Sequence, residues 1–415
     1  MIRRFQALGL AALVVMAGTV LAQSPPALAQ TSEIGFQAYA FGSQVNVGST
    51  VKSGRSAFVV LPCTPQVGVT RTNTVADVNA SPLLTSGTVD TTAASAGTTT
   101  GVASTASATV QNASLLGGLV SVTTVRSVST SNRNSTNGAF STSAAGTEFT
   151  GLSVDRIPII GMPAPNTRIS LPGVGYVILN QQYPAAGPGQ TELTVIGIHL
   201  VVTVATPLAP IGTSIIVADA FSGLAGPVEG LLSGLAYGTN ANVAKTIIAG
   251  QSFPEYMPCL GTNGTTRTNS GAAVDIPGIL TSGTVTDTAN GTATATSVSG
   301  EMSSTVQNLN LVSGLVTATA LKADVTAAGN PATLGDHSSF LGLEVAGFPR
   351  IGDTPPPNTK LTLAGIGTLW LHRVFKTTTS ITVIMVQLVV TVSGNPLGLA
   401  VGTTVNVAYA RVGIS

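Results

Sequence analysis

Apolar and polar residues alternate along most of the chain in the two-residue rhythm of β-strands. Thr, Val, Ser, Ala and Gly dominate, and Gly- or Pro-rich turn clusters recur at intervals of about ten residues. No stretch has the apolar spacing of a convincing amphipathic helix. The pattern therefore predicts an all-β protein.

The clearest strand covers Leu193–Val204 and has a close copy at Ile381–Val392. Both faces of this strand are fairly apolar, which favours a central position over an edge. A strand of this length would span roughly 40 Å, so we expect a bend or bulge in it. Its period-two apolar residues are predicted to share one face, and they are Ile196, Ile198, Leu200, Val202 and Val204, repeated as Ile384, Val386, Leu388, Val390 and Val392.

Many short motifs occur twice at a constant separation of 196 positions. The repeat predicts two homologous domains, copy 1 over residues 30–228 and copy 2 over residues 229–415, with a Gly- and Pro-rich linker at Gly223–Pro227. The matched pairs include Gly42 and Gly238, Arg71-Thr72-Asn73 and Arg267-Thr268-Asn269, Leu84–Val89 and Leu280–Val285, and Val110-Gln111-Asn112 and Val306-Gln307-Asn308.

Each copy has about 190 residues, which is enough for one domain with its own core. Turn clusters between short strands favour two tandem β-sandwiches. A β-helix is the alternative, because alternating Thr residues also suit stacked coils.

Residues 1–29 have the features of a secretory signal peptide. Arg3 and Arg4 supply the positive start, Leu8–Leu21 is apolar, and Ala27-Leu28-Ala29 is an A-x-A cleavage site. A retained N-terminal anchor helix is the alternative. We expect a secreted protein, extracellular or loosely associated with the cell surface, with no membrane span in the mature chain and no C-terminal anchor.

Charged residues make up only 8% of the chain, against about a quarter in ordinary globular chains. Without residues 1–29 the chain would keep 15 basic and 16 acidic side chains. A nearly neutral protein has no electrostatic reason to bind nucleic acid or an anionic membrane. Its solubility must come from Ser, Thr, Asn and Gln, which suits a wall or surface protein.

Repeated motifs also carry a resemblance to a known family. They are VQNASLLGGLVSV at Val110–Val122 with VQNLNLVSGLVTA at Val306–Ala318, Pro165-Asn166-Thr167 with Pro357-Asn358-Thr359, each before a Gly-x-Gly, and the late HLVVTV strand. Together with the signal peptide, they resemble the choice-of-anchor P family of secreted bacterial proteins. The resemblance covers nearly all of the mature chain and implies a surface protein with a duplicated β domain and no established activity. The variable C-terminal anchor of that family has no obvious counterpart here.

Cys63 and Cys259 are the two cysteines of the chain, and an even count in a secreted protein suggests a disulfide. Their Cα atoms would have to lie within about 7 Å. Domains stacked by translation hold equivalent residues a domain length apart, whereas a pseudo-two-fold axis can bring them together. A Cys63–Cys259 bond would imply the two-fold arrangement, and the alternative is two buried or intermolecularly paired thiols.

The histidines are not shared by the two copies. His199 corresponds to Gln387, and His372 corresponds to Asn180. We therefore interpret both, together with His337, as ordinary surface or hairpin residues rather than metal ligands or catalytic bases.

The acidic residues are scattered. We interpret Asp77-x-Asn79 and Asp287-x-x-Asn290 as solvated turns rather than calcium ligands, because a calcium loop needs several acids close together. No P-loop, HExxH, Cys-x-x-Cys or Gly-x-Ser-x-Gly pattern occurs. The sequence therefore predicts no cofactor, no metal site and no catalytic residues.

Arg71 and Arg267 are the strongest repeated polar residues. They could contact a ligand or partner, or they could tie down a loop, with Asn73 and Asn269, through hydrogen bonds to backbone carbonyls. We favour the loop-binding role, because repetition in both copies fits a scaffold.

The leading functional hypothesis is a structural or adhesive surface protein without enzymatic activity, whose partners are cell-wall or extracellular polymers or surface proteins. A carbohydrate-binding module is the second hypothesis, although it needs exposed aromatic rings and Trp370 is the single tryptophan. The third is a secreted hydrolase with an unrecognised site.

Overall fold

The structure is a computed structural model that describes residues 31–48, 50–187, 189–226, 228, 230–243, 246–249, 251–276, 278–294, 296–349 and 351–415. This part consists of β-strands joined by turns and loops, without an α-helix, so the all-β prediction is confirmed. None of its elements is a helix long and apolar enough to cross a membrane. The expected signal peptide lies outside the described residues.

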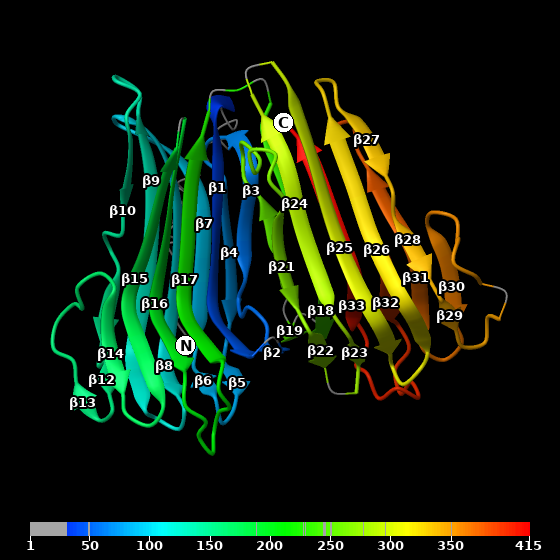
Figure 1. The fold of residues 1–415 in the computed structure, drawn as a ribbon, viewed down its shortest axis with the longest axis horizontal. Coiled ribbons are helices and arrows are strands. Elements are labelled where there is room, and N and C mark those ends of the chain that lie inside the picture. Colours follow the sequence, from blue (N-terminus) through cyan, green and yellow to red (C-terminus); the bar gives the residue numbers. More distant parts are fainter. Residues whose placement is uncertain are drawn as a thin grey trace, which may run out of the picture.

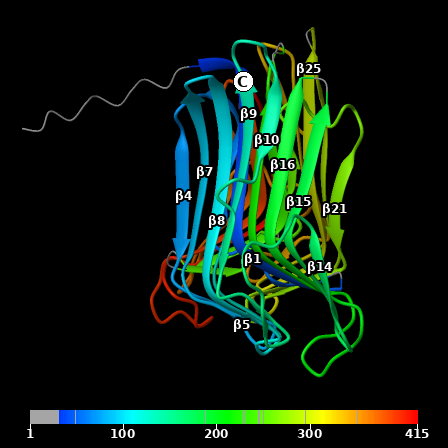
Figure 2. The same ribbon diagram turned by 90° about the vertical axis from the view of Figure 1, so that its left-hand side faces the viewer.

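Copy 1 forms a sandwich of two antiparallel sheets (Figure 1). The first sheet contains, in spatial order, β14 (Thr167–Leu171), β15 (Gly175–Gly187), β16 (Gln190–Val202), β17 (Thr213–Ala225), β1 (Thr31–Val47) and β3 (Val59–Gln66). The facing sheet is built on β4 (Thr70–Val75), β7 (Val89–Thr98), β8 (Gly101–Leu115) and β9 (Val120–Asn134). Figure 2 shows β4, β7 and β8 on one side of this sandwich and β15 and β16 on the other.

Short strands complete the second sheet of copy 1. Strands β10 (Phe140–Ser143), β11 (Glu148–Thr150) and β12 (Ser153–Val154) pair with β9 along its length, and β13 (Ile157–Pro158) pairs with β12. A hairpin of β5 (Val78–Ala80) and β6 (Leu84–Ser86) pairs with the end of β8.

Copy 2 repeats this sandwich. Its first sheet contains β30 (Thr359–Leu363), β31 (Gly367–Lys376), β32 (Ser380–Val390), β33 (Thr404–Ile414) and β18 (Leu232–Val243), with β19 (Thr246–Ala249) and β20 (Glu255–Met257) beside β18. The facing sheet contains β21 (Arg267–Gly271), β24 (Val285–Ala293), β25 (Val298–Leu311) and β26 (Val316–Ala328). Short strands extend it, namely β22 (Ala273–Ile276), β23 (Leu280–Ser282), β27 (Thr333–Asp336), β28 (Ser339–Leu341) and β29 (Glu344–Val345).

The two sandwiches are related by a pseudo-two-fold rotation rather than by translation. Strand β2 (Thr50–Ser53) pairs in parallel with β22 and so joins the first sheet of copy 1 to the second sheet of copy 2. Figure 1 shows β15, β16, β17 and β1 in one layer with β24, β25 and β26. The first sheet of copy 1 thus lies in the same layer as the second sheet of copy 2. A two-fold rotation about an axis parallel to the strands produces this exchange of layers, whereas a translation would keep the first sheets in one layer.

Each sandwich has its own apolar core, and a small third cluster lies between them. The expected linker begins later than predicted. Gly223, Leu224 and Ala225 are the last residues of β17, and Leu224 is fully buried. These Gly-rich residues belong to the strand and not to a linker, because β17 stays paired with β1 and β16 as far as Ala225.

The long strand of copy 1 is central, as predicted, because β16 pairs with β15 on one side and β17 on the other. The prediction of one continuous apolar face is wrong. Ile198, Leu200 and Val202 lie in the core, but Ile196 is not part of that cluster and Val204 is 49% exposed beyond the strand. The pairing skips Gly197 on both sides of β16, so the residues before it turn to the opposite face.

Copy 2 has the same interruption in β32. Val386, Leu388 and Val390 lie in the core, whereas Ile384 does not join it and Val392 is 39% exposed. The pairing here skips Met385, which is the equivalent of Gly197. The expected irregularity is therefore a row of unpaired positions that crosses the central strands of each first sheet.

Candidate functional site at the domain junction

The structure joins Cys63 of β3 to Cys259, which follows β20, by a disulfide across the junction. Their Cα atoms lie 5.4 Å apart, within the range that a disulfide needs. Both cysteines are buried, and Ala225 and Leu231 pack beside them. Two equivalent residues can meet only close to a two-fold axis, so the bond marks the place where that axis passes.

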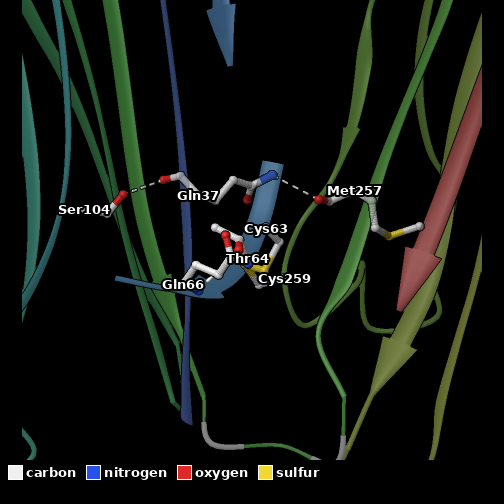
Figure 3. The surroundings of a disulfide bond; sticks show 7 residues. All are labelled: Gln37, Cys63, Thr64, Gln66, Ser104, Met257 and Cys259. Carbon is white, nitrogen blue, oxygen red and sulfur yellow. Dashed lines mark hydrogen bonds between the residues drawn. A yellow bond between two sulfur atoms is a disulfide. The ribbon is translucent and has the colours of Figure 1, made fainter. Parts of the chain in front are cut away.

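Two linked hydrogen bonds lie next to the disulfide, and one of them crosses from copy 1 to copy 2, as Figure 3 shows. The side-chain amide of Gln37 donates to the Met257 carbonyl at 3.0 Å, and the Ser104 hydroxyl donates to the Gln37 carbonyl at 2.8 Å. Gln37 and Ser104 are buried, so these bonds are shielded from water. The junction is therefore held by directional hydrogen bonds as well as by apolar contacts.

One side of the junction carries a cluster of aromatic rings around Arg55, which we call the aromatic cluster. Tyr39 stacks on Phe221 with 4.8 Å between ring centroids and on Tyr256 of copy 2 with 5.4 Å. Phe58 lies within 6.4 Å of Tyr39 and 6.0 Å of Tyr256, centroid to centroid. Offset and stacked ring pairs stabilise a contact beyond the area that they bury.

The guanidinium of Arg55 ties this cluster together. Its Cζ lies 5.3 Å from the Tyr39 ring centroid and 5.5 Å from that of Tyr256, and Nη1 donates a hydrogen bond to the Tyr256 hydroxyl at 3.0 Å. Burial raises the pKa of the Tyr256 hydroxyl to about 12, although the adjacent Arg55 opposes the shift. Arg55 thus binds the two copies through cation–π contacts and a charge-assisted hydrogen bond.

Three carboxyl groups accompany the aromatic cluster. Burial raises the pKa of Asp219 to about 7, with Arg55 acting against it. Burial also raises the pKa of Glu192 and Glu255, and in both the nearby Arg267 opposes the shift. Arg267 therefore lies near two carboxyl groups.

The groove related to this cluster by the pseudo-two-fold has a different character, and we call it the arginine groove. Strands β3 and β4 of copy 1 and β18, β32 and β33 of copy 2 line it beside Cys63. Arg71 and Arg411 line it together with the hydroxyl residues Ser233, Thr379 and Ser380. No Asp or Glu is among the described residues that line this groove.

In the Arg-Thr-Asn repeat, both Asn residues and Arg71 form the hydrogen bonds to backbone carbonyls that the sequence favoured. The Asn73 amide donates to the Phe58 carbonyl at 2.9 Å, and the Asn269 amide donates to the Pro254 carbonyl, which is the equivalent position, at 3.0 Å. Arg71 donates through Nη1 to the Val60 carbonyl at 3.0 Å, and its side chain is otherwise exposed.

The histidines are more engaged than the sequence suggested. His199 is half-buried on β16, with Nδ1 2.9 Å from Gln181 Oε1 and Nε2 3.1 Å from Ser214 Oγ. His372 Nε2 lies 2.9 Å from Asp336 Oδ2 in a half-buried ion pair. Neither is an ordinary surface residue. Sequence reasoning missed this because the partners come from neighbouring strands and not from neighbouring residues.

The interpretation of Asp287 as part of a solvated turn is wrong. Asp287 lies in β24 and is fully buried, and neither carboxylate oxygen has a hydrogen-bond partner. Burial raises the pKa of this carboxyl well above its usual value, although Gly238 and Ser304 lie close enough to oppose the shift. Asp77 is exposed in the short connection before β5, as expected.

The described residues contain no group of three or more His, Cys, Asp or Glu side chains that could hold a metal ion. No protein-family model matches the chain, and no curated protein matches it either. The resemblance to the choice-of-anchor P family therefore stays a prediction.

Sequence comparison between the copies could not find the aromatic cluster. Arg55 corresponds to Gln251, Tyr39 to Leu235 and Tyr256 to Val60. Comparison of the copies highlights residues that both share, and these three residues occur in one copy only. The signal that could have found them is a difference between equivalent residues, because the two sides of a pseudo-two-fold junction are built from different residues.

Proposed function

We propose that this protein is a secreted or cell-surface structural or adhesive protein that acts as one rigid two-domain body and not as an enzyme. The observation that carries the proposal is the junction, where a disulfide, parallel strand pairing and the buried hydrogen bond from Gln37 to Met257 join the two sandwiches. Domains within one chain usually move relative to one another unless their interface is firm. A firm interface suits a protein that bears load or holds two surfaces at a fixed spacing.

Cell fractionation tests this proposal. We expect a culture that expresses the full chain to yield a product that starts near Gln30, in the medium or on washed cells, from which salt or mild denaturant releases it. Full-length product that stays in the cytosol would contradict the proposal. So would turnover by the purified protein in a screen of hydrolase substrates, if substitution of a single acid or histidine abolishes it.

A carbohydrate-binding role is the second candidate, and the environment of Trp370 favours it. Trp370 is half-buried on β31, and Arg373 and Lys360 lie over its ring at 4.7 and 5.4 Å from the centroid. Gln387, which pairs with Trp370 on the next strand and is buried, donates an amide hydrogen bond to Asn406 at 2.8 Å. Aromatic rings beside amides and cations are groups that bind sugars through stacking and hydrogen bonds.

Retention on insoluble glycans tests this second candidate. We expect Trp370→Ala to lower the retention of the mature chain, while Phe348→Ala, at a half-buried loop residue of the same copy, leaves it unchanged. Equal retention of both variants would exclude the Trp370 surface as the binding site.

A further inference from the structure

The two sides of the junction are equivalent by the repeat, and each therefore serves as a reference for the other. Arg71 and Arg267 occupy matched positions, one on each side. Glu192 of β16 and Ser380 of β32 also occupy matched positions, because their partners on the next strand are the equivalent residues Gly223 and Gly413. The side around Arg267 has a carboxylate where the side around Arg71 has a hydroxyl.

Two further exchanges act in the same direction. Glu255 beside Arg267 corresponds to Val59 in copy 1, so the arginine groove loses a second acid. Phe221 of the aromatic cluster corresponds to Arg411, since Phe221 faces Thr194 and Arg411 faces Thr382 at the same register. Three exchanges thus remove two negative charges from the arginine groove and add one positive charge.

A charge concentration of this kind stands out in a chain with 8% charged residues. Neither Arg71 nor Arg411 forms an ion pair among the described residues. The guanidinium of Arg71 uses one donor on the Val60 carbonyl and is otherwise exposed, which leaves several of its N–H groups available. A guanidinium group suits carboxylate or sulfate groups, which it binds through two parallel hydrogen bonds.

We propose that the arginine groove binds the anionic groups of an acidic polysaccharide, with Arg71 and Arg411 on the charge and Ser233, Thr379 and Ser380 on neighbouring sugar hydroxyls. Hydroxyl side chains can donate and accept hydrogen bonds, as sugar hydroxyls require. The groove spans both copies beside the disulfide, so a ligand in it would contact both copies. This proposal rests on the proposed adhesive function and names its ligand class.

Direct binding to defined polymers tests the proposal. The mature chain would be titrated with polygalacturonate, with dextran sulfate and with fully methyl-esterified polygalacturonate, which has the same backbone without the charge. We expect salt-sensitive binding to one or both charged polymers and none to the ester. Preference between the first two distinguishes a carboxylate ligand from a sulfate ligand.

Three matched variants localise the binding. We expect Arg71→Gln and Arg411→Gln each to weaken it by about tenfold or more, because each removes a charge-assisted contact. Arg267→Gln, the equivalent substitution on the side that holds Glu192 and Glu255, should change it less than about twofold. Thermal unfolding of each variant checks that the fold is intact.

Three results would overturn the proposal. They are no binding of the wild-type chain to either charged polymer, equal binding to the methyl ester, and equal losses in Arg267→Gln and Arg411→Gln. The proposed function fails separately. If washed cells retain the protein but neither charged polymer binds, the adhesive function stands and the arginine groove is not its contact.

Discussion

Gly42 of β1 lies directly against Val89 of β7, and a Cβ atom at position 42 would be 2.1 Å from Val89 Cγ1. The same relationship occurs in copy 2, where a Cβ at Gly238 would lie 2.3 Å from Val285 Cγ1. The amides of both glycines donate to equivalent carbonyls, those of Ser56 and Ser252. Here the two sheets of each sandwich approach too closely for a side chain on β1 or β18, which explains why glycine occurs opposite valine in both copies.

Alanine at either glycine should destabilise the fold. We expect Gly42→Ala and Gly238→Ala each to lower the free energy of unfolding by about 1–3 kcal/mol, because the methyl group overpacks the core. Chemical denaturation measures the change.

The double variant Gly42→Ala/Val89→Ala should recover part of the loss, because it removes the obstructing methyl groups. Gly352→Ala is the control, since nothing lies within 4 Å of its Cβ position. A loss in the control as large as that at Gly42 would refute the packing explanation.

The buried carboxyl of Asp287 should make stability depend on pH. Its pKa in the folded state is raised above the unfolded value by burial, so its contribution to stability is fully present below about pH 3.9 and is lost as the pH rises towards the folded pKa. Asp287→Thr should remove this dependence. It should also raise stability at pH 7 by about 1–3 kcal/mol, the cost of a buried unsatisfied group.

Copy 1 shows why threonine suits position 287. Thr91, its equivalent, donates to the Ala57 carbonyl at 2.5 Å and lies 3.1 Å from the Asn73 carbonyl. Asp77→Thr, at an exposed acid, is the control. Denaturation curves from pH 4 to 8 that are the same for wild type and Asp287→Thr would show that the carboxyl is not the cause.

The ion pair of His372 and Asp336 should add stability over a different range of pH. The hydrogen bond to Asp336 raises the pKa of His372, whereas hydrogen bonds from His372 and Ser338 outweigh burial and lower the pKa of Asp336. The histidine's contribution is complete below its unfolded pKa of about 6.5 and is lost as the pH rises through the folded value. The carboxylate's contribution is complete above about pH 3.9 and is lost in acid.

His372→Asn copies the residue at Asn180 and should reduce stability near pH 5.5 more than near pH 8.5. Melting temperatures at the two values measure the difference, with His337→Asn as the control for a histidine outside this ion pair. A shift of equal size at both values would mean that the imidazole acts through packing alone.

Arg55 should stabilise the junction rather than either sandwich core. Arg55→Gln installs the copy 2 residue, Gln251, and removes the cation–π contacts with Tyr39 and Tyr256. We expect a loss of about 1–3 kcal/mol and faster amide exchange in β3 and β20. Arg168→Gln, which removes the 3.8 Å contact with Tyr176 away from the junction, should leave exchange in those strands unchanged.

The fold class could be predicted from the sequence because alternation and repetition are local signals. The central place of Leu193–Val204 followed from its two apolar faces. The change of face before Gly197 could not be predicted. It depends on Asn180 and Ala218 of the neighbouring strands, which both have left-handed backbone conformations. Asp287 was misread for a similar reason, since its burial is set by the facing sheet.

The site was harder to predict than the fold. Asn73 and Asn269 could be identified because both copies use them in the same way. Arg55, Tyr256 and Arg411 could not, because an internal repeat marks what is shared, whereas a junction on a pseudo-two-fold axis is made partly of what differs. Only the geometric condition on Cys63 and Cys259 connected the sequence to that junction.

The pairing of Cys63 with Cys259 is the most direct test of the account, because the two-fold arrangement and both sides of the junction depend on it. The measurement is a peptide map of the secreted protein, alkylated without reduction and digested. We predict one disulfide-linked peptide pair that contains both cysteines and separates on reduction. Free, alkylated thiols at both positions, or bonds between two chains, would contradict the account.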